Sequence, residues 1–425
     1  MASRARALLC AAPLILSPQL ASSASRDAEI ERLEAELAAT RQELEQTRSA
    51  LEGVERRLER LESGPSAPAQ APAAAAAAPP PRVAPVNANN PALSFVVDTT
   101  ARYDTQGDGV DFALRSGELF LSAPIDPFLR GYAAVAGSSD EGFELEEAAL
   151  VTTALPWNLT LRGGRFHAAF GRMSPWHDEQ LPFVDRPPSL DRLVGGESSA
   201  EGAELSWLAP IGPFFRVSAG LFDSLGSERR EELMQSGFQG RRAFDELTWL
   251  VRPSTYADLT DALNLELGAS FATVAEQGRR FLYGVDATLR HQPGTSGFYQ
   301  GFVLGSEWLW NDEEFDGVVT GTDPGTGDPI LGDKRYARTG GYAYLEGFFG
   351  RRYSLGLRGD YSEALAGARG IQRSASGFAT WTPSEFQRLR FQFDQIDRDD
   401  AHGDQRLTLQ WTAFLGSHAH GFMAR

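Results

Sequence analysis

The chain has little of several things on which other protein classes depend. Its 425 residues include one cysteine, Cys10, so a disulfide framework and thiol chemistry are excluded. Six histidines are present, which leaves few candidates for a catalytic base, and no nucleophile motif accompanies them. The formal net charge of -17 excludes a broad basic surface for nucleic acid. We therefore predict neither an enzyme nor a nucleic-acid-binding protein.

A long apolar helix is missing as well. Beyond the N-terminal region, no segment approaches the roughly 18 uninterrupted apolar residues that an α-helical membrane span requires. In a bilayer every backbone polar group must be paired within the protein, which leaves a closed β-barrel as the other spanning structure. A membrane protein with this sequence is therefore expected to be a barrel.

The N-terminus predicts export from the cytoplasm. Arg4 and Arg6 precede an apolar run over residues 7–16, and small residues follow at 21–24. This order is typical of a secretory signal peptide, which we place at residues 1–24. Its removal would take Cys10 with it.

Residues 25–63 predict an α-helical coiled coil. Apolar side chains recur every seven residues, and Glu, Arg and Gln fill the positions between them. The helix is expected to associate with copies of itself, although a single solvated helix is the alternative, and Gly53 weakens the repeat. The oligomerisation residues are Ile30, Leu33, Leu37, Leu44, Leu51, Val54, Leu58 and Leu61.

An Ala/Pro-rich linker follows at residues 64–92, where the composition favours a semi-extended spacer. From residue 93 to 425, segments of about ten residues alternate apolar and polar side chains. Leu389, Phe391 and Phe393 share one face of such a segment, and Arg390 and Asp394 share the other. The pattern is typical of a transmembrane barrel with lipid outside and water inside, whereas a water-soluble β-sandwich is the alternative.

The spacing of the breaks favours the barrel. We count about sixteen antiparallel strands, an even number within the range of outer-membrane barrels. If the first strand runs outward, most inner connections are short and carry Pro or Gly, with residues 252–261 among the longer ones. The outer connections then include long polar segments, about 171–200, 224–245 and 311–338. Short inner and long outer connections are characteristic of outer-membrane barrels.

The third outer connection, about residues 171–200, holds the strongest candidate site. Charged residues of an inward-folded loop would set selectivity by size and field. Packing of the loop against the wall, with its charges solvated, is the alternative. The pore-constriction candidates are His177, Asp178, Glu179, Asp185 and Arg186, and the lumen-lining candidates are Glu266, Arg358, Asp360, Arg388, Arg390, Asp394 and Arg406.

No metal ligand or other cofactor is assigned from the sequence. The spacing of His177, Asp178 and Glu179 fits no dedicated metal site, and the sequence leaves open whether His177 and Glu179 share an ion. His418 and His420 follow the last predicted strand and are close enough in sequence to clamp a metal if the tail is extended.

Several segments together resemble bacterial outer-membrane porin-like proteins related to phosphate-selective porins, a group often labelled zinc-regulated or TonB-dependent receptors. The segments are 90–95, 146–148, 162–166, 183–187, 205–210 and 415–420. An energy-coupled receptor would also need a plug domain, and residues 25–90 form the predicted coiled coil and spacer instead. The resemblance therefore implies a plug-free porin.

We thus predict an outer-membrane porin for passive diffusion of small hydrophilic solutes or ions, with its coiled coil in the periplasm. It is expected to contact outer-membrane lipid and to form a homo-oligomer, with a trimer preferred because general porins are commonly trimeric. The alternative function is a structural tether whose coiled coil contacts the cell wall. No nucleic-acid partner is expected.

Overall fold

The computed structural model describes residues 91–107, 109–139, 142–226, 244, 246–274, 279–292, 300–365, 370–399 and 401–416. The predicted signal peptide, coiled coil and most of the linker lie outside the described residues, as do His418 and His420. Within the described ranges, no helix combines the length and the apolar character needed to cross a membrane.

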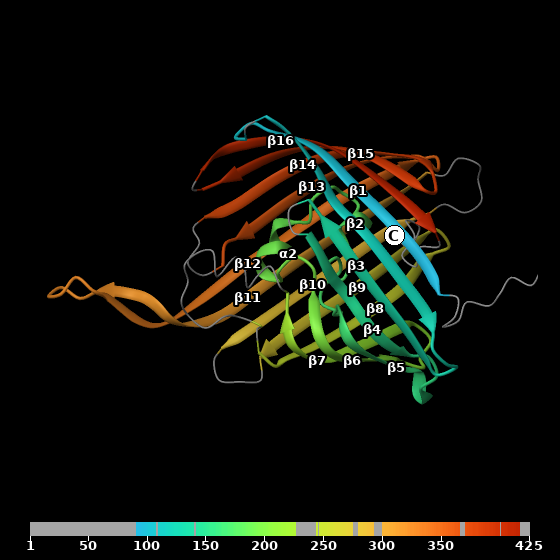
Figure 1. Cartoon of the computed structure of the whole chain (residues 1–425), viewed down its shortest axis with the longest axis horizontal. Helices are drawn as coiled ribbons and strands as arrows, with labels where there is room; N and C mark the ends of the chain where they lie inside the picture. The colour runs from blue at the N-terminus through green and yellow to red at the C-terminus, as the bar shows by residue number, and fades with distance from the viewer. Residues whose placement is uncertain are drawn as a thin grey trace, which may run out of the picture. The chain divides into compact units, whose positions relative to one another are not determined.

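Sixteen antiparallel strands dominate this part of the chain, as the alternation predicts (Figure 1). They are β1 (Ala92–Asp104), β2 (Val110–Pro124), β3 (Leu129–Ser138), β4 (Gly142–Thr152), β5 (Leu159–His167), β6 (Ser199–Leu208), β7 (Phe214–Leu225), β8 (Thr248–Thr260), β9 (Leu263–Val274), β10 (Arg280–His291), β11 (Gln300–Thr322), β12 (Pro329–Phe349), β13 (Tyr353–Glu363), β14 (Ile371–Ser384), β15 (Gln387–Arg398) and β16 (Ala401–Gly416). Three short helices accompany them: η1 (Pro156–Asn158), η2 (Asp178–Gln180) and α2 (Pro188–Leu193).

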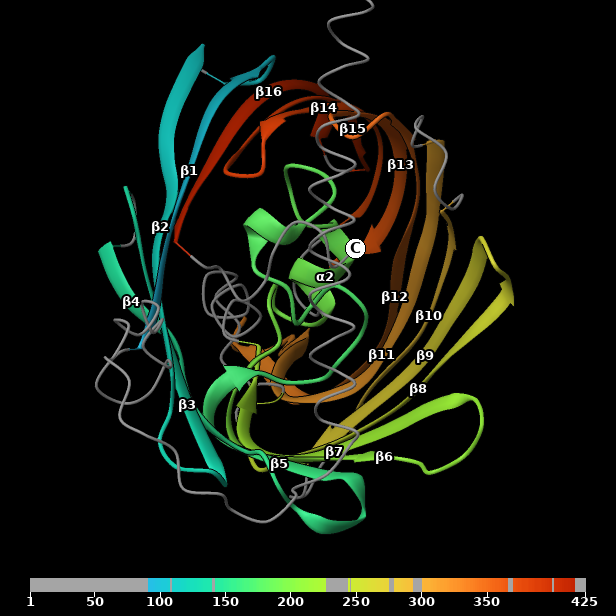
Figure 2. The same cartoon turned by 90° about the vertical axis from the view of Figure 1, so that its right-hand side faces the viewer.

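The strands close into one barrel (Figure 2). Each strand pairs with its neighbours in sequence, and β1 completes the ring by pairing with β16 from Ser94↔Gly416 to Asp104↔Arg406. Closure removes the free edges that an open sheet would expose. The prediction of a closed all-β barrel with about sixteen strands is confirmed.

The outer surface of the barrel is apolar and its inner surface is polar. On β16, Leu409 and Trp411 are 48% and 53% exposed, whereas Gln410 and Thr412, which alternate with them, are fully buried. A water-soluble protein has the opposite distribution, because its apolar side chains leave water. The alternation therefore places apolar side chains on the outside of the barrel, which excludes a water-soluble β-sandwich.

Two connections differ from the predicted ones. The segment at 311–338 continues as a long hairpin, in which β11 and β12 stay paired out to Thr322↔Pro329. Its composition is as polar as that of a loop. A hairpin that extends beyond the apolar outer surface of the barrel needs no apolar face. The segment at 252–261 belongs to β8 up to Thr260, so the inner connection to β9 is short. Pro253, near the start of this segment, pairs with Val217 within the ladder.

Candidate functional site

The third outer connection, between β5 and β6, lies inside the barrel. Figure 2 shows α2 and the segments flanking it within the ring of strands. The helix packs against the inner faces of β12 and β13, and Ser362 on β13 donates a hydrogen bond to the carbonyl of Pro188 at 3.2 Å. The loop, here residues 168–198, therefore occupies part of the lumen.

Apolar packing holds the loop on one side of the lumen. Phe183 is fully buried and meets Tyr344 and Phe378 edge to face, at ring-centroid distances of 5.6 and 6.1 Å. The guanidinium of Arg358 lies 4.2 Å above its ring centroid, a cation–π contact. Burial of this ring from the loop against rings from the wall makes Phe183 the apolar anchor of the loop.

Replacing Phe183 with alanine is expected to destabilise the protein by about 3–5 kcal/mol, because it leaves a cavity between the loop and the wall. Thermal unfolding in detergent measures the loss. Phe143→Ala, at a side chain that is 91% exposed, is the matched control and is expected to change little. Equal effects of the two substitutions would contradict the anchoring role.

Charged side chains of the wall hold the loop backbone as well. Arg388 donates to the carbonyl of Glu179, and Arg390 donates to the carbonyl of Leu181 at 3.0 Å. The carbonyl of Val184 accepts from Arg115 at 2.5 Å. Hydrogen bonds from charged donors are stronger than those between neutral groups. Arg388 and Arg390, predicted to line the lumen, thus lie beneath the loop, where they are 2% and 1% exposed.

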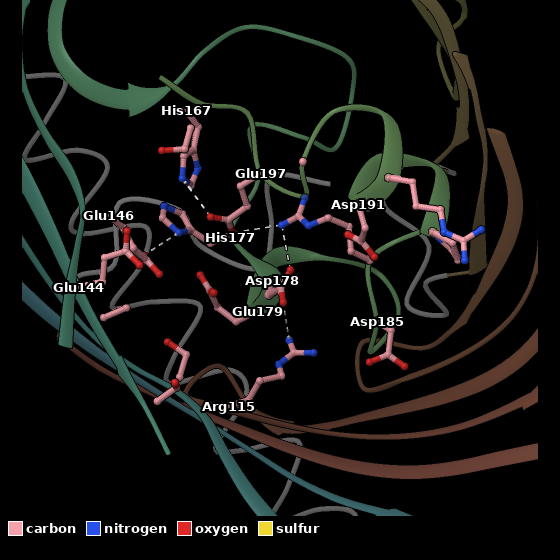
Figure 3. Close-up of a pocket in the computed structure, with 18 of the residues that line it drawn as sticks. Arg115, Glu144, Glu146, His167, His177, Asp178, Glu179, Asp185, Asp191 and Glu197 are labelled. Carbon is pink, nitrogen blue, oxygen red and sulfur yellow. Dashed lines mark hydrogen bonds and ion pairs between the residues drawn. The ribbon is translucent and has the colours of Figure 1, made fainter. Parts of the chain in front are cut away.

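Between the loop and the wall formed by β1–β6 and β13–β16 lies a cavity of about 910 Å³. All five pore-constriction candidates contribute to its lining, and Figure 3 shows four of them together. Among the lumen-lining candidates, Arg358, Asp394 and Arg406 also face this cavity. The remaining two lie on the inner wall in ion pairs, Glu266 with Arg172 at 2.5 Å and Asp360 with Arg358 at 2.9 Å.

Asp185 organises the basic side of the cavity. Its carboxylate lies 2.5 Å from Arg102 and 3.5 Å from Arg406, and its carbonyl accepts from Arg358 at 2.6 Å. Burial alone would raise the pKa of Asp185, but the guanidinium groups of Arg102, Arg406, Arg115 and Arg358 outweigh that and lower it. Asp185 therefore stays ionised and joins the loop to three strands.

Arg186 organises the loop itself rather than the cavity. It donates to the carbonyls of Met173 at 2.9 Å and Trp176 at 2.6 Å. Its guanidinium also pairs with Asp178 at 2.8 Å and Glu197 at 3.1 Å. These contacts join the two halves of the loop, so Arg186 contributes chiefly to the shape of the constriction.

The acidic side of the cavity is centred on His177. Its Nε2 lies 3.0 Å from Glu147, and its Nδ1 lies 3.2 Å from Glu146 and 3.9 Å from Glu118. Burial disfavours the imidazolium, but these carboxylates outweigh that and hold the pKa of His177 well above its usual range. Figure 3 shows His177 between Glu146 on one side and His167 with Glu197 on the other.

Two further loop carboxyls have shifted pKa values. Burial, together with the charge of Glu118, raises the pKa of Glu179 to about 8. For Glu197, burial opposes ionisation, but the contact of 3.0 Å with His167 outweighs it and lowers the pKa. Burial therefore favours the protonated form of Glu179, whereas His167 favours the ionised form of Glu197.

The sequence did not relate His177 to its partners, which come from β2, β4 and the end of β5. One local signal was available in the adjacent pair Glu146-Glu147. Neighbouring strand residues normally face opposite sides, but the pairing of β3 with β4 shifts register between Ala134 and Val135 and skips Glu146. This bulge allows both carboxylates to reach the same imidazole.

Comparisons with known proteins agree with the fold. No protein-family model matches the chain. A protein of Aquifex aeolicus (strain VF5), described as uncharacterized, is 28% identical over 351 residues, which span 73% of this chain and 70% of the relative.

Among solved structures, a loop L8 deletion mutant of OmpT, an outer membrane protein of Vibrio cholerae, superimposes with a TM-score of 0.50 at 9% identity. The match covers 77% of this chain and 99% of that one. The outer membrane channel DcaP of Acinetobacter baumannii gives 0.49 at 11% identity, over 77% and 97% of the two chains. At such identities the likeness to OmpT shows a shared β-barrel fold.

Proposed function

We propose that the protein is an outer-membrane channel through which small hydrophilic solutes or ions diffuse passively. One observation carries the proposal: a closed barrel, apolar outside, encloses a charged cavity of about 910 Å³ beside an inward-folded loop. A pore of this kind selects by its width and by the charges along it. The resemblance to porins related to phosphate-selective ones supports the same function.

The charges that line the cavity favour weak selectivity between cations and anions. Its lining holds equal numbers of basic and acidic side chains, and several of them pair with one another across short distances. They are Arg102, Arg115, Arg165, Arg186, Arg192, Arg358, Arg398 and Arg406, and Glu144, Glu146, Asp178, Glu179, Asp185, Asp191, Glu197 and Asp394. Because the two signs are equal in number and interspersed, the lining creates no strong potential of one sign along the pore.

Planar-bilayer recording on the purified protein tests the proposal. We expect stepwise conductance and, in a tenfold KCl gradient, a small reversal potential that corresponds to a permeability ratio within roughly threefold of unity. The same preparation after heat denaturation is the control. An absence of current steps from folded protein would overturn the channel function.

The expected assembly is a homo-oligomer in the outer membrane, with a trimer preferred and the coiled coil of residues 25–63 in the periplasm. Removing that segment and measuring the mass of the detergent-solubilised protein tests whether it is needed for association. The tether alternative predicts instead that the same deletion detaches the outer membrane from the cell wall while the barrel carries no current.

A further inference from the structure

Two histidines and several carboxylates lie close together where the third loop contacts the inner wall of the barrel. The rings of His167 and His177 lie 4.5 Å apart between centroids, and both side chains are buried. Glu147 on β4 offers a third ligand, and one ligand atom from each of these three residues lies within 4.8 Å of the others. Figure 3 shows the two imidazoles facing one another beside Glu146 and Glu197.

This cluster holds more negative charge than the histidines can balance. Glu118, Glu146, Glu147 and Glu197 surround the two rings. Even with both histidines protonated and Arg186 paired with Glu197 at 3.1 Å, four carboxylates face three positive charges. Buried charge that lacks a counter-ion is costly, so the arrangement favours an additional cation.

Three buried polar atoms in the cluster lack hydrogen-bond partners within the part of the chain that the structure describes. They are Oε1 of Glu118, Oε2 of Glu146 and Nδ1 of His167, although Oε2 of Glu146 forms an ion pair with His177 at 3.2 Å. The Glu118 side chain is 1% exposed, and its other oxygen faces His177 at 3.9 Å. Buried polar atoms are normally paired, and an unpaired one often marks an ion or water that completes the site.

The chemistry of the donors identifies the class of ion. Magnesium and calcium prefer shells made of oxygen alone, whereas imidazole nitrogens with carboxylate oxygens suit divalent transition metals. With the metal on Nε2 of His177, its Nδ1–H would donate to Glu146, which already lies 3.2 Å away. Such a hydrogen bond to a carboxylate orients a metal-bound imidazole in many proteins.

We propose that Glu147, His167 and His177 bind one divalent transition-metal ion, with Glu146 as the residue that positions His177. His177 belongs to the loop, and Glu147 and His167 belong to β4 and the end of β5. The ion therefore ties the loop to the wall on its acidic side, opposite the anchor at Phe183. Metal binding is independent of ion conduction and is measured without it.

Titration of the full-length protein with cobalt tests the site. The protein is purified in detergent, stripped with a chelator, and titrated with Co²⁺, whose visible absorption reports nitrogen and oxygen ligation; Zn²⁺ then competes and Mg²⁺ serves as the control. The tail variant His418→Ala/His420→Ala removes the other histidine pair in the sequence. We expect one Co²⁺ per chain in wild type and in this variant, displaced by Zn²⁺ and unaffected by Mg²⁺.

Substitutions in the site separate ligands from the positioning residue. His167→Ala/His177→Ala is expected to weaken Co²⁺ binding by more than about 100-fold, and Glu146→Gln by roughly 10- to 100-fold, as for other residues that orient a metal ligand. His291→Ala, at a ring stacked on Phe302 outside the cluster, is expected to leave binding unchanged. Heat modifiability on gels confirms that each variant is folded.

Two results would overturn the site: less than one Co²⁺ bound per folded chain in the tail variant, or unchanged affinity in the folded His167→Ala/His177→Ala variant. The tail-variant measurement requires no substitution in the barrel and so decides the question even if the double histidine variant fails to fold. Absence of Co²⁺ binding by the folded wild-type protein, together with normal conductance, would reject this site alone and leave the channel function intact.

Discussion

Replacing both Arg388 and Arg390 with alanine is expected to loosen the third loop and to increase the conductance and the current noise of the open channel. The two guanidinium groups donate to the carbonyls of Glu179 and Leu181, the part of the loop that precedes Phe183. A hydrogen bond to a charged group contributes about 1.5–3 kcal/mol, several times the thermal energy. Without both hydrogen bonds this segment has fewer contacts with β15, so it samples a wider range of positions in the lumen.

Single-channel recordings measure this effect, and two variants serve as controls. Arg373→Ala removes an arginine whose side chain is 52% exposed and pairs with Asp399, away from the loop, so its recordings should match wild type. Arg388→Lys/Arg390→Lys keeps both charges with less suitable donor geometry and is expected to be intermediate. If the double alanine variant behaves like Arg373→Ala, the two arginines do not hold the loop.

Replacing Asp185 with asparagine is expected to shift the permeability ratio toward anions by roughly twofold to fivefold. The substitution removes the carboxylate that Arg102 and Arg406 contact, so their positive charge acts on the pore. We also expect the substitution to lower the free energy of unfolding by about 2 kcal/mol. Breaking a fully buried ion pair costs roughly 3–5 kcal/mol, and the effect is smaller here because the Asp185 side chain is 24% exposed.

Reversal potentials measure the shift, and Asp323→Asn provides the control because Asp323 caps the exposed turn between β11 and β12 rather than the cavity. An unchanged reversal potential in Asp185→Asn, or an equal shift in both variants, would show that Asp185 does not set the field of the pore.

The same carboxylate gives the protein a dependence on pH. Neighbouring arginines lower the folded-state pKa of Asp185 below the value of about 3.9 that is usual for an unfolded chain. Its stabilising contribution is therefore complete above about pH 4 and is lost as the pH falls through the lower folded-state pKa. Thermal unfolding in detergent from pH 7 to pH 3 should show a smaller decrease for Asp185→Asn than for wild type.

Strand positions were predictable because their signal is local. Each strand repeats its apolar and polar residues every two positions, so the number of strands and the outward face of β15 and β16 follow from the sequence. The signal fails where lipid contact ends. Beyond Asn311 the hairpin of β11 and β12 has no apolar face, so its residues do not alternate between apolar and polar. Its pairing is visible only in the structure.

The site depended on contacts between distant parts of the chain. The sequence selected His177 and Asp185 from the composition of one loop, and both face the cavity. It did not relate Glu118, Glu147 or His167 to His177, because each belongs to a different strand and has no local feature that connects it with the loop. Likewise, nothing within β15 indicates that Arg390 donates to a carbonyl 209 positions earlier in the chain.

The sequence by itself determined the barrel, because alternation along each strand specifies which side chains face outward. The tertiary structure decided what the barrel encloses. Closure of β1 on β16 and insertion of the third loop bring arginines to loop carbonyls and carboxylates to histidines. Such pairings depend on distance in space, which a pattern confined to neighbouring residues does not contain.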